Sequence, residues 1–313
     1  MELRTLGKSA LEVSRIGFGS WAIGGHGYGY VDDDTSKKAI WKALDLGINF
    51  FDTASVYGFG HSESLLSEAL GEQRHKVVIA TKFGVNWDSE GNLYRDCSSQ
   101  RILQSLEGSL RRLRVDSIPL YQIHWHDGRT SIDEIMETLQ LCRDAGKIRY
   151  IGCCNFLPEL IDAARASGDP ISLQALYNVR NRENEKLMAD CLDHQMGVVA
   201  YEVLGRGLFS GKYSIKSEFG ENDTRSRDQQ FREKDLERNI EISRMLSEVG
   251  ARYGKSASQT AIRWVLDKSF VTCALVGAKT PAQVEENAGS LGWCMVEEDL
   301  ERVNLLKSPK VLV

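Results

Sequence analysis

The stretch Ile48-Asn49-Phe50-Phe51-Asp52 is a short apolar run that ends in a charged residue, and this arrangement recurs along the chain. Val77–Thr81 leads into Lys82, and Ile118–Ile123 leads into His124. Such runs are typical of strands that are buried on both faces of a parallel sheet. Because chemistry in parallel α/β folds gathers at the carboxyl ends of the strands, we expect the polar residues that end these runs to meet at one site.

The alternation of apolar runs with amphipathic segments predicts repeated βα units. The expected strands are Ile16–Gly19, Ile48–Phe51, Val77–Thr81, Ile118–Ile123, Ile148–Cys153, Ile171–Gln174, Gly197–Ala200 and Cys273–Val276. The expected helices are Asp34–Leu46, Glu63–Leu70, Ser99–Leu113, Ile132–Ala145, Leu157–Ser167 and Asn184–Gln195, with N-caps at Thr35, Ser62 and Ser131. This order favours a closed (β/α)8 TIM barrel, with a doubly wound sheet as the alternative.

Several segments fall outside the repeat. Residues 1–15 alternate apolar and polar side chains around a glycine, which predicts a hairpin ahead of the first barrel strand. The polar segment 212–236 is expected to be either a disordered insertion or a lid. Two helices, Leu236–Tyr253 and Ala257–Leu266, are expected before the last strand, so that one of them is extra, and another is expected at Glu297–Lys307. We expect residues 1–313 to form a single domain.

Composition excludes several classes of protein. The 313 residues are 42% hydrophobic and 27% charged, which suits a globular protein with a large core. The net charge of −5 argues against a nucleic-acid partner. No apolar stretch approaches the roughly 18–20 residues needed to cross a bilayer, so no membrane partner is expected. Seven cysteines without paired spacing, and a start that lacks a signal peptide, indicate a cytoplasmic enzyme.

A tuned general acid is predicted from three of the strand-end residues and one loop tyrosine. Tyr57 follows Asp52 in the same loop. An ammonium at Lys82 would lower the pKa of the Tyr57 phenol from its ordinary value of about 10, and Asp52 would keep that ammonium charged. His124 could hydrogen-bond the carbonyl oxygen that receives the proton. The hydride must come from a cofactor, because no side chain supplies one.

Ordered motifs along essentially the whole chain resemble the aldo-keto reductase family. They are Ile16-Gly17-Phe18-Gly19-Ser20-Trp21, Phe51-Asp52-Thr53-Ala54 with Tyr57-Gly58, Thr81-Lys82, Leu120-Tyr121-Gln122-Ile123-His124-Trp125, Gly146–Gly152, Asn155-Phe156, Gln174–Asn178, Leu204–Leu208, Gly211-Lys212-Tyr213, Gly277-Ala278-Lys279 and Gln283–Asn287. The details are similar to the bacterial branch that includes sugar- and inositol-related reductases and general stress reductases. The resemblance implies a (β/α)8 barrel, NAD(P)H-dependent reduction of a carbonyl or oxidation of a polyol, and the catalytic tetrad Asp52, Tyr57, Lys82 and His124.

The resemblance also implies where the cofactor binds. Asn155 and Gln174 would hold the nicotinamide carboxamide, and Tyr201 would stack on the ring. Pyrophosphate, adenosine phosphate and adenine contacts would come from Leu204, Arg206, Gly207, Lys212, Lys279, Gln283, Glu286 and Asn287. The remaining cofactor residues would be Ser20, Trp21, Asp52, Cys154, Glu202 and Gly277. The loop 203–236 would lie over this site.

Substrate residues are expected in the loops after the strands. Trp21, Trp87 and Trp125 could form an aromatic wall around the carbonyl compound, together with Tyr57 and His124. The identity of the compound and the oligomeric state are not readable from the sequence.

Three positions depart from the family pattern. Cys154 stands where the family usually has serine, Glu202 brings a carboxylate toward the expected phosphates, and Gln283 replaces a frequent arginine. NADP is still favoured over NAD, because Lys279 is present and Arg225 and Arg227 could add charge near a 2′-phosphate.

The sequence leaves two alternative functions, a metal-dependent hydrolase and a regulatory subunit. His124 and His126 could open the metal site of a barrel hydrolase, but later strand ends offer no clear further ligands, so no metal is expected. A protein of this fold could also serve as a cofactor-binding regulatory subunit with little turnover.

Overall fold

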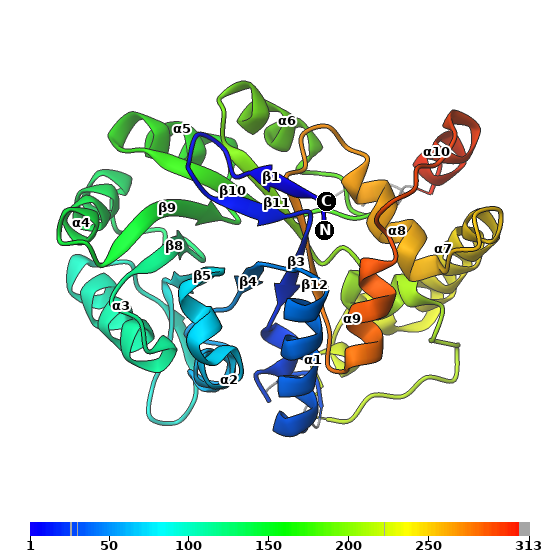
Figure 1. Cartoon of the computed structure of the whole chain (residues 1–313), viewed down its shortest axis with the longest axis horizontal. Coiled ribbons are helices and arrows are strands. Elements are labelled where there is room, and N and C mark those ends of the chain that lie inside the picture. Colours follow the sequence, from blue (N-terminus) through cyan, green and yellow to red (C-terminus); the bar gives the residue numbers. More distant parts are fainter. Residues whose placement is uncertain (26, 30, 222, 307–313) are drawn as a thin grey trace.

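The computed structural model describes residues 1–25, 27–29, 31–221 and 223–306. Eight parallel strands close into a barrel in the order β10-β11-β12-β3-β4-β5-β8-β9 (Figure 1). They are β3 (Ile16–Gly19), β4 (Phe50–Asp52), β5 (Val78–Phe83), β8 (Ile118–Ile123), β9 (Ile148–Cys154), β10 (Pro170–Leu176), β11 (Gly197–Tyr201) and β12 (Cys273–Gly277). The closed barrel confirms the predicted (β/α)8 fold, and the doubly wound alternative is wrong.

Helices between the strands form the outer layer of the barrel (Figure 1). They are α1 (Asp33–Asp45), α2 (His61–Leu70), α3 (Ser99–Leu113), α4 (Ile132–Asp144), α5 (Pro158–Ser167), α6 (Glu185–Asp193), α7 (Glu233–Ala251), α8 (Ala257–Leu266), α9 (Pro281–Ala288) and α10 (Glu297–Asn304). Both α7 and α8 precede β12, so one helix is additional to the repeat, as predicted. The expected last helix extended to Lys307, which lies outside the described residues.

The helix starts were predicted less well than the helices themselves. Ser131 does cap α4, because its side chain accepts a hydrogen bond from the Glu134 backbone N–H. The caps expected at Thr35 and Ser62 are wrong. The Asp32 side chain caps α1 by accepting from Thr35, and α2 begins after Gly60, whose φ of 93° only glycine adopts readily. Ser62 lies inside α2, where its hydroxyl contacts Ser20 instead.

A hairpin closes the amino-terminal end of the barrel. Its strands β1 (Leu3–Thr5) and β2 (Glu12–Ser14) pair antiparallel. Leu6, Leu11 and Val13 are buried in one cluster with residues from the interior of the barrel, among them Phe50, Leu120, Val199 and Leu275. The amino-terminal half of the barrel interior is therefore filled by apolar side chains, and the polar residues of the candidate site lie toward its carboxyl end.

A second hairpin was not predicted. The short strands β6 (Val85–Trp87) and β7 (Leu93–Arg95) pair antiparallel beyond the end of β5. All three residues of β7 are exposed, so the apolar alternation that marks a strand is missing there.

The polar segment 212–236 folds back on the barrel. It contains the short 3-10 turns Thr224–Ser226 and Gln229–Phe231. Tyr213, Phe219 and Phe231 pack edge to face with one another, with ring centroids 5.0–5.7 Å apart. The Thr224 N–H also donates to the Gly27 carbonyl at 2.9 Å, which connects this segment to the loop after β3. Among the described residues, every helix is too short or too polar to traverse a lipid bilayer.

Gly7 lies in the turn of the amino-terminal hairpin, and its close contact with the backbone of neighbouring strands gives a stability prediction. Gly7 has φ of +57°, and a Cβ there would lie 2.3 Å from the Ile171 carbonyl oxygen. Gly146 has φ of +73° but open space around a Cβ. We expect Gly146→Ala to lower the free energy of unfolding by about 1–2 kcal/mol through backbone strain alone. Gly7→Ala should cost about 1–3 kcal/mol more, because it also forces backbone apart. Denaturant unfolding of both variants measures the difference. An equal decrease in the free energy of unfolding would show that the close backbone contact at Gly7 does not stabilise the barrel.

Candidate active site

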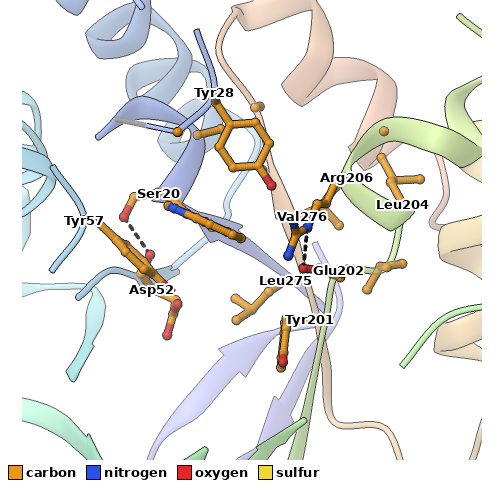
Figure 2. A pocket seen from close by; sticks show the side chains of 18 of the residues that line it. Ser20, Tyr28, Asp52, Tyr57, Tyr201, Glu202, Leu204, Arg206, Leu275 and Val276 are labelled. Carbon is orange, nitrogen blue, oxygen red and sulfur yellow. Dashed lines mark hydrogen bonds and ion pairs between the residues drawn. The ribbon is translucent and has the colours of Figure 1, made fainter. Parts of the chain in front are cut away.

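The carboxyl ends of the barrel strands surround a cavity of about 710 Å³ (Figure 2). It is lined by the predicted cofactor residues Ser20, Trp21, Asp52, Asn155, Gln174, Tyr201, Glu202, Leu204, Arg206, Gly207, Lys212, Gly277, Lys279, Gln283, Glu286 and Asn287. Tyr57 and His124 line it as well. Cys154, which was also expected to bind the cofactor, is not among the residues that line the cavity.

Lys82 lies under the cavity floor and is fully buried. Its ammonium forms an ion pair with Asp52, donates to the Thr53 carbonyl at 2.8 Å, and lies 3.4 Å from the Tyr57 hydroxyl. Burial is the largest single influence and lowers the pKa of Lys82, but the Asp52 carboxylate, with smaller contributions from Tyr57 and Cys154, more than offsets it and holds that pKa above its ordinary range. The lysine therefore stays charged beside the phenol.

The Tyr57 phenol is less acidic than the sequence predicted. Burial raises its pKa to about 12, because the surrounding protein disfavours the phenolate more than Lys82 favours it. The Asp52 carboxylate adds to the increase. The expectation of a lowered pKa counted the ammonium but omitted desolvation. In this structure Tyr57 holds its proton at neutral pH.

His124 faces Tyr57 edge-on, with ring centroids 5.8 Å apart. Burial, followed by the charge of Lys82, holds the pKa of His124 well below its ordinary value. The imidazole is therefore neutral at physiological pH and has one N–H to donate. The Asn155 side chain holds the loop by donating to the His124 carbonyl at 3.1 Å.

The second oxygen of Asp52 accepts two amide hydrogen bonds. Gln174 donates to it at 2.9 Å and Gln122 at 3.2 Å. Gln122 was missed by the sequence analysis, although it shares a strand face with His124 two residues later. The Cys154 thiol contacts the Gln122 side-chain oxygen at 3.6 Å, inside the barrel.

Glu202 does not present a free carboxylate to the cavity. It pairs with Arg206 at 2.8 Å (Figure 2). Arg206 also pairs with Asp228 at 3.1 Å. The Arg206 guanidinium lies 5.3 Å from the centre of the Trp21 ring. The departure at Glu202 is therefore balanced by a neighbouring cation. Tyr28, a further lining residue that the sequence did not single out, packs edge-on against Trp21.

The far end of the cavity is basic. Lys212, Arg225 and Lys279 line it together with the start of α9. The pKa of Lys279 is lowered, first by burial and then by the charge of Arg225. Lys279 donates to the Tyr28 carbonyl at 2.6 Å, and Arg225 pairs with Asp223. Arg227, which was expected to add charge, is not among the lining residues.

The opposite end is apolar and aromatic. Trp21 and Trp125 line it, as do Val56, Val85 and Leu93, which the sequence did not point out. Trp87 does not. It packs on Phe59 with centroids 5.6 Å apart and faces a separate cleft, because the unpredicted hairpin turns it away.

Asn155 and Tyr201 are joined directly. The Tyr201 hydroxyl donates to the Asn155 side-chain oxygen at 2.7 Å. Asn155 has a positive φ of 57°, a conformation that asparagine tolerates better than most residues. The hydrogen bond fixes the amide that faces the middle of the cavity.

His126 takes no part in a metal-binding arrangement with His124. One of its ring nitrogens is 2.8 Å from the Thr130 carbonyl, and the other accepts from the Gly128 N–H at 3.1 Å. Within the described parts of the chain, no group of three or more His, Cys, Asp and Glu side chains is placed to hold a metal ion.

Comparison with known proteins agrees with this geometry. The family model "Aldo/keto reductase family" matches residues 15–307. The chain is 37% identical to Aldo-keto reductase YhdN of Bacillus subtilis, covering 98% of this chain and 93% of the relative. It is 32% identical to the NADH-specific methylglyoxal reductase of Escherichia coli, covering 94% of both.

Solved structures give the same result. The glycerol dehydrogenase AKR11B4 from Gluconobacter oxydans superposes with a TM-score of 0.89 at 38% identity, covering 97% of this chain and 94% of that one. The aldo-keto reductase AKR11C1 from Bacillus halodurans gives 0.82 at 26% identity, covering 98% and 97%. The chain therefore belongs to the aldo/keto reductase family and is an NAD(P)H-dependent oxidoreductase.

Proposed function

We propose that the enzyme reduces an aldehyde or ketone to an alcohol with NADPH, and that Tyr57 is the proton donor. The observation that carries this proposal is the contact between the Tyr57 hydroxyl and the Lys82 ammonium, which in turn pairs with Asp52. A protonated phenol at the wall of a large cavity, beside a permanent cation, is suited to donate a proton to an oxygen that gains negative charge.

The residues around the cavity fit a nicotinamide dinucleotide. Asn155 and Gln174 offer amides for a carboxamide, and Tyr201 offers a ring face beside them. Lys212, Arg225 and Lys279 give the far end the positive charge that phosphates require. Lys279 precedes α9, whose amino-terminal N–H groups add to that attraction.

The reaction divides between cofactor and protein. When bound, the nicotinamide supplies the hydride for the carbonyl carbon. Tyr57 gives its proton to the carbonyl oxygen, and Lys82 stabilises the phenolate that remains. Asp52 keeps Lys82 charged and in place. His124 donates a hydrogen bond to the same oxygen and orients the substrate.

Replacing Tyr57 by Phe tests the proton donor. Because only the hydroxyl is removed, kcat should fall by about 10²–10⁴-fold. The Kd for NADPH, measured by fluorescence titration, should remain within about threefold, a change of less than about 0.7 kcal/mol. Carbonyl reduction at the wild-type rate would contradict the role of Tyr57. Tight cofactor binding with negligible turnover in the wild type would favour a regulatory subunit instead.

Replacing Lys279 by Gln tests the choice of cofactor. We expect the Kd for NADPH to rise at least about tenfold through loss of a charge-assisted contact to the 2′-phosphate, while the Kd for NADH changes little. Lys42→Gln is the matched control. Lys42 pairs with Glu285 of α9, the helix that Lys279 precedes, but Lys42 does not line the cavity. Equal weakening of both cofactors would show that Lys279 does not read the 2′-phosphate.

The pH dependence follows from the two shifted groups. Reduction needs a protonated Tyr57, whose pKa is raised to about 12, so kcat/KM for reduction should stay level between pH 6 and 9. The reverse oxidation needs the phenolate, and its rate should rise with pH over that range. His124 stays neutral because its pKa is lowered, so no inflection near pH 6.5 is expected. Such an inflection, abolished by His124→Gln, would contradict this assignment.

A further inference from the structure

The unpredicted hairpin β6–β7 forms one side of the apolar end of the cavity. Val85 of β6 and Leu93 of β7 both line the cavity wall. Arg95 lies directly opposite Val85 in the strand pairing and two residues after Leu93. Side chains two residues apart, or directly paired across strands, project to the same face of a hairpin. Arg95 is not itself among the residues that line the cavity, but its side chain lies beside it, over the ring of the lining residue Trp125.

The Arg95 guanidinium lies over the ring of Trp125. The Cζ of Arg95 lies 4.5 Å from the centre of the Trp125 ring, the distance of a cation–π contact. Trp125 lines the cavity and directly follows His124 in the chain. Its backbone is held in place, because the Cys97 thiol donates to the Trp125 carbonyl at 3.4 Å. The charge of Arg95 is close enough to contribute to the lowered pKa of His124, after burial and Lys82.

Arg95 has no acidic partner in the described parts of the chain, and neither does its neighbour Arg129, which donates to the Arg95 carbonyl at 3.0 Å. The nearby carboxylates are engaged elsewhere. Asp96 faces Arg101, and Asp127 accepts hydrogen bonds from Cys97, Arg129 and Thr130. Of the acidic residues that line the cavity, Asp52 and Glu202 are paired with cations and Glu286 is at the basic end. None of these carboxylates forms an ion pair with Arg95, so its guanidinium remains available to a substrate that enters beside Trp125.

We propose that Arg95 is an anion-binding residue at the mouth of the substrate site, and that the preferred substrates are aldehydes carrying a carboxylate or a phosphate a few bonds from the carbonyl. The inference rests on the proposed function, since it assumes that the carbonyl lies between Tyr57 and His124. Guanidinium groups bind either oxyanion through paired N–H donors. The chain between carbonyl and anion would pack on Trp125, Val85 and Leu93.

The test compares charged and neutral substrates of similar length. We would measure kcat/KM for 4-oxobutanoate against butanal, and for glyceraldehyde 3-phosphate against glyceraldehyde, at saturating cofactor. The wild type should prefer the charged member of at least one pair, and the pair concerned identifies carboxylate or phosphate. Arg95→Gln should reduce that preference about 10- to 100-fold, the effect of losing one charge-assisted contact. The kcat/KM for the neutral member should change less than about threefold.

Arg149→Gln is the matched control. Arg149 is also an exposed arginine that lies over an aromatic ring, that of Tyr150, but it stands at the start of β9, away from the cavity. This variant loses the same net charge and should keep the wild-type preference. Arg95→Lys should retain part of the preference, and raising the salt concentration should weaken it in the wild type but not in Arg95→Gln.

The outcomes separate the two proposals. If no carbonyl compound of either pair is reduced, the proposed function fails, and this inference fails with it. If charged and neutral members are reduced equally well by the wild type, or if Arg95→Gln leaves the preference unchanged, Arg95 does not bind the substrate and the proposed function stands.

Discussion

The carboxyl end of this barrel depends on the buried ion pair between Lys82 and Asp52. A fully buried ammonium is strongly destabilising unless its charge and its donors are matched. Here the Lys82 ammonium pairs with Asp52 and donates a hydrogen bond to the Thr53 carbonyl. The second oxygen of Asp52 accepts hydrogen bonds from the side-chain amides of Gln122 and Gln174. Together with Lys82 on β5, these residues lie on or directly after strands β4, β8 and β10, so the pair connects four strands of the barrel. The barrel in turn keeps Lys82 within reach of Tyr57.

Charge around the cavity is divided by position. At the floor and along the Glu202–Arg206 contact, each charge has a partner of opposite sign. Toward the two ends, positive charge is in excess, with Lys212 and Lys279 lining one end and Arg95 lying beside the other, over the Trp125 ring. Paired charges fix the shape of a site, whereas unpaired charges remain available to a ligand. This division suits a long anionic cofactor at one end and a small substrate at the other.

Sequence patterns predicted the barrel strands to within a few residues because each is a dense apolar run that the barrel buries on both sides. The cavity residues were predictable from the pattern alone wherever they immediately follow such a run, as Asp52 and His124 do. The hairpin β6–β7 could not be predicted, since all of β7 is exposed and carries no apolar alternation, and the orientation of Trp87 and the position of Arg95 were missed with it. The pKa of Tyr57 was misjudged for a different reason. Sequence indicates which charges are neighbours, but the depth of burial, which sets the larger effect here, is a property of the folded chain.

The amino-terminal hairpin gives the barrel a stopper at one rim. Leu6, Leu11 and Val13 fill that rim, and Gly7 rests against the backbone of neighbouring strands. The cavity beside Tyr57 therefore lies at the end of the barrel away from this rim. A ligand that occupies the cavity covers the Tyr57 hydroxyl and so limits proton exchange between that hydroxyl and bulk water.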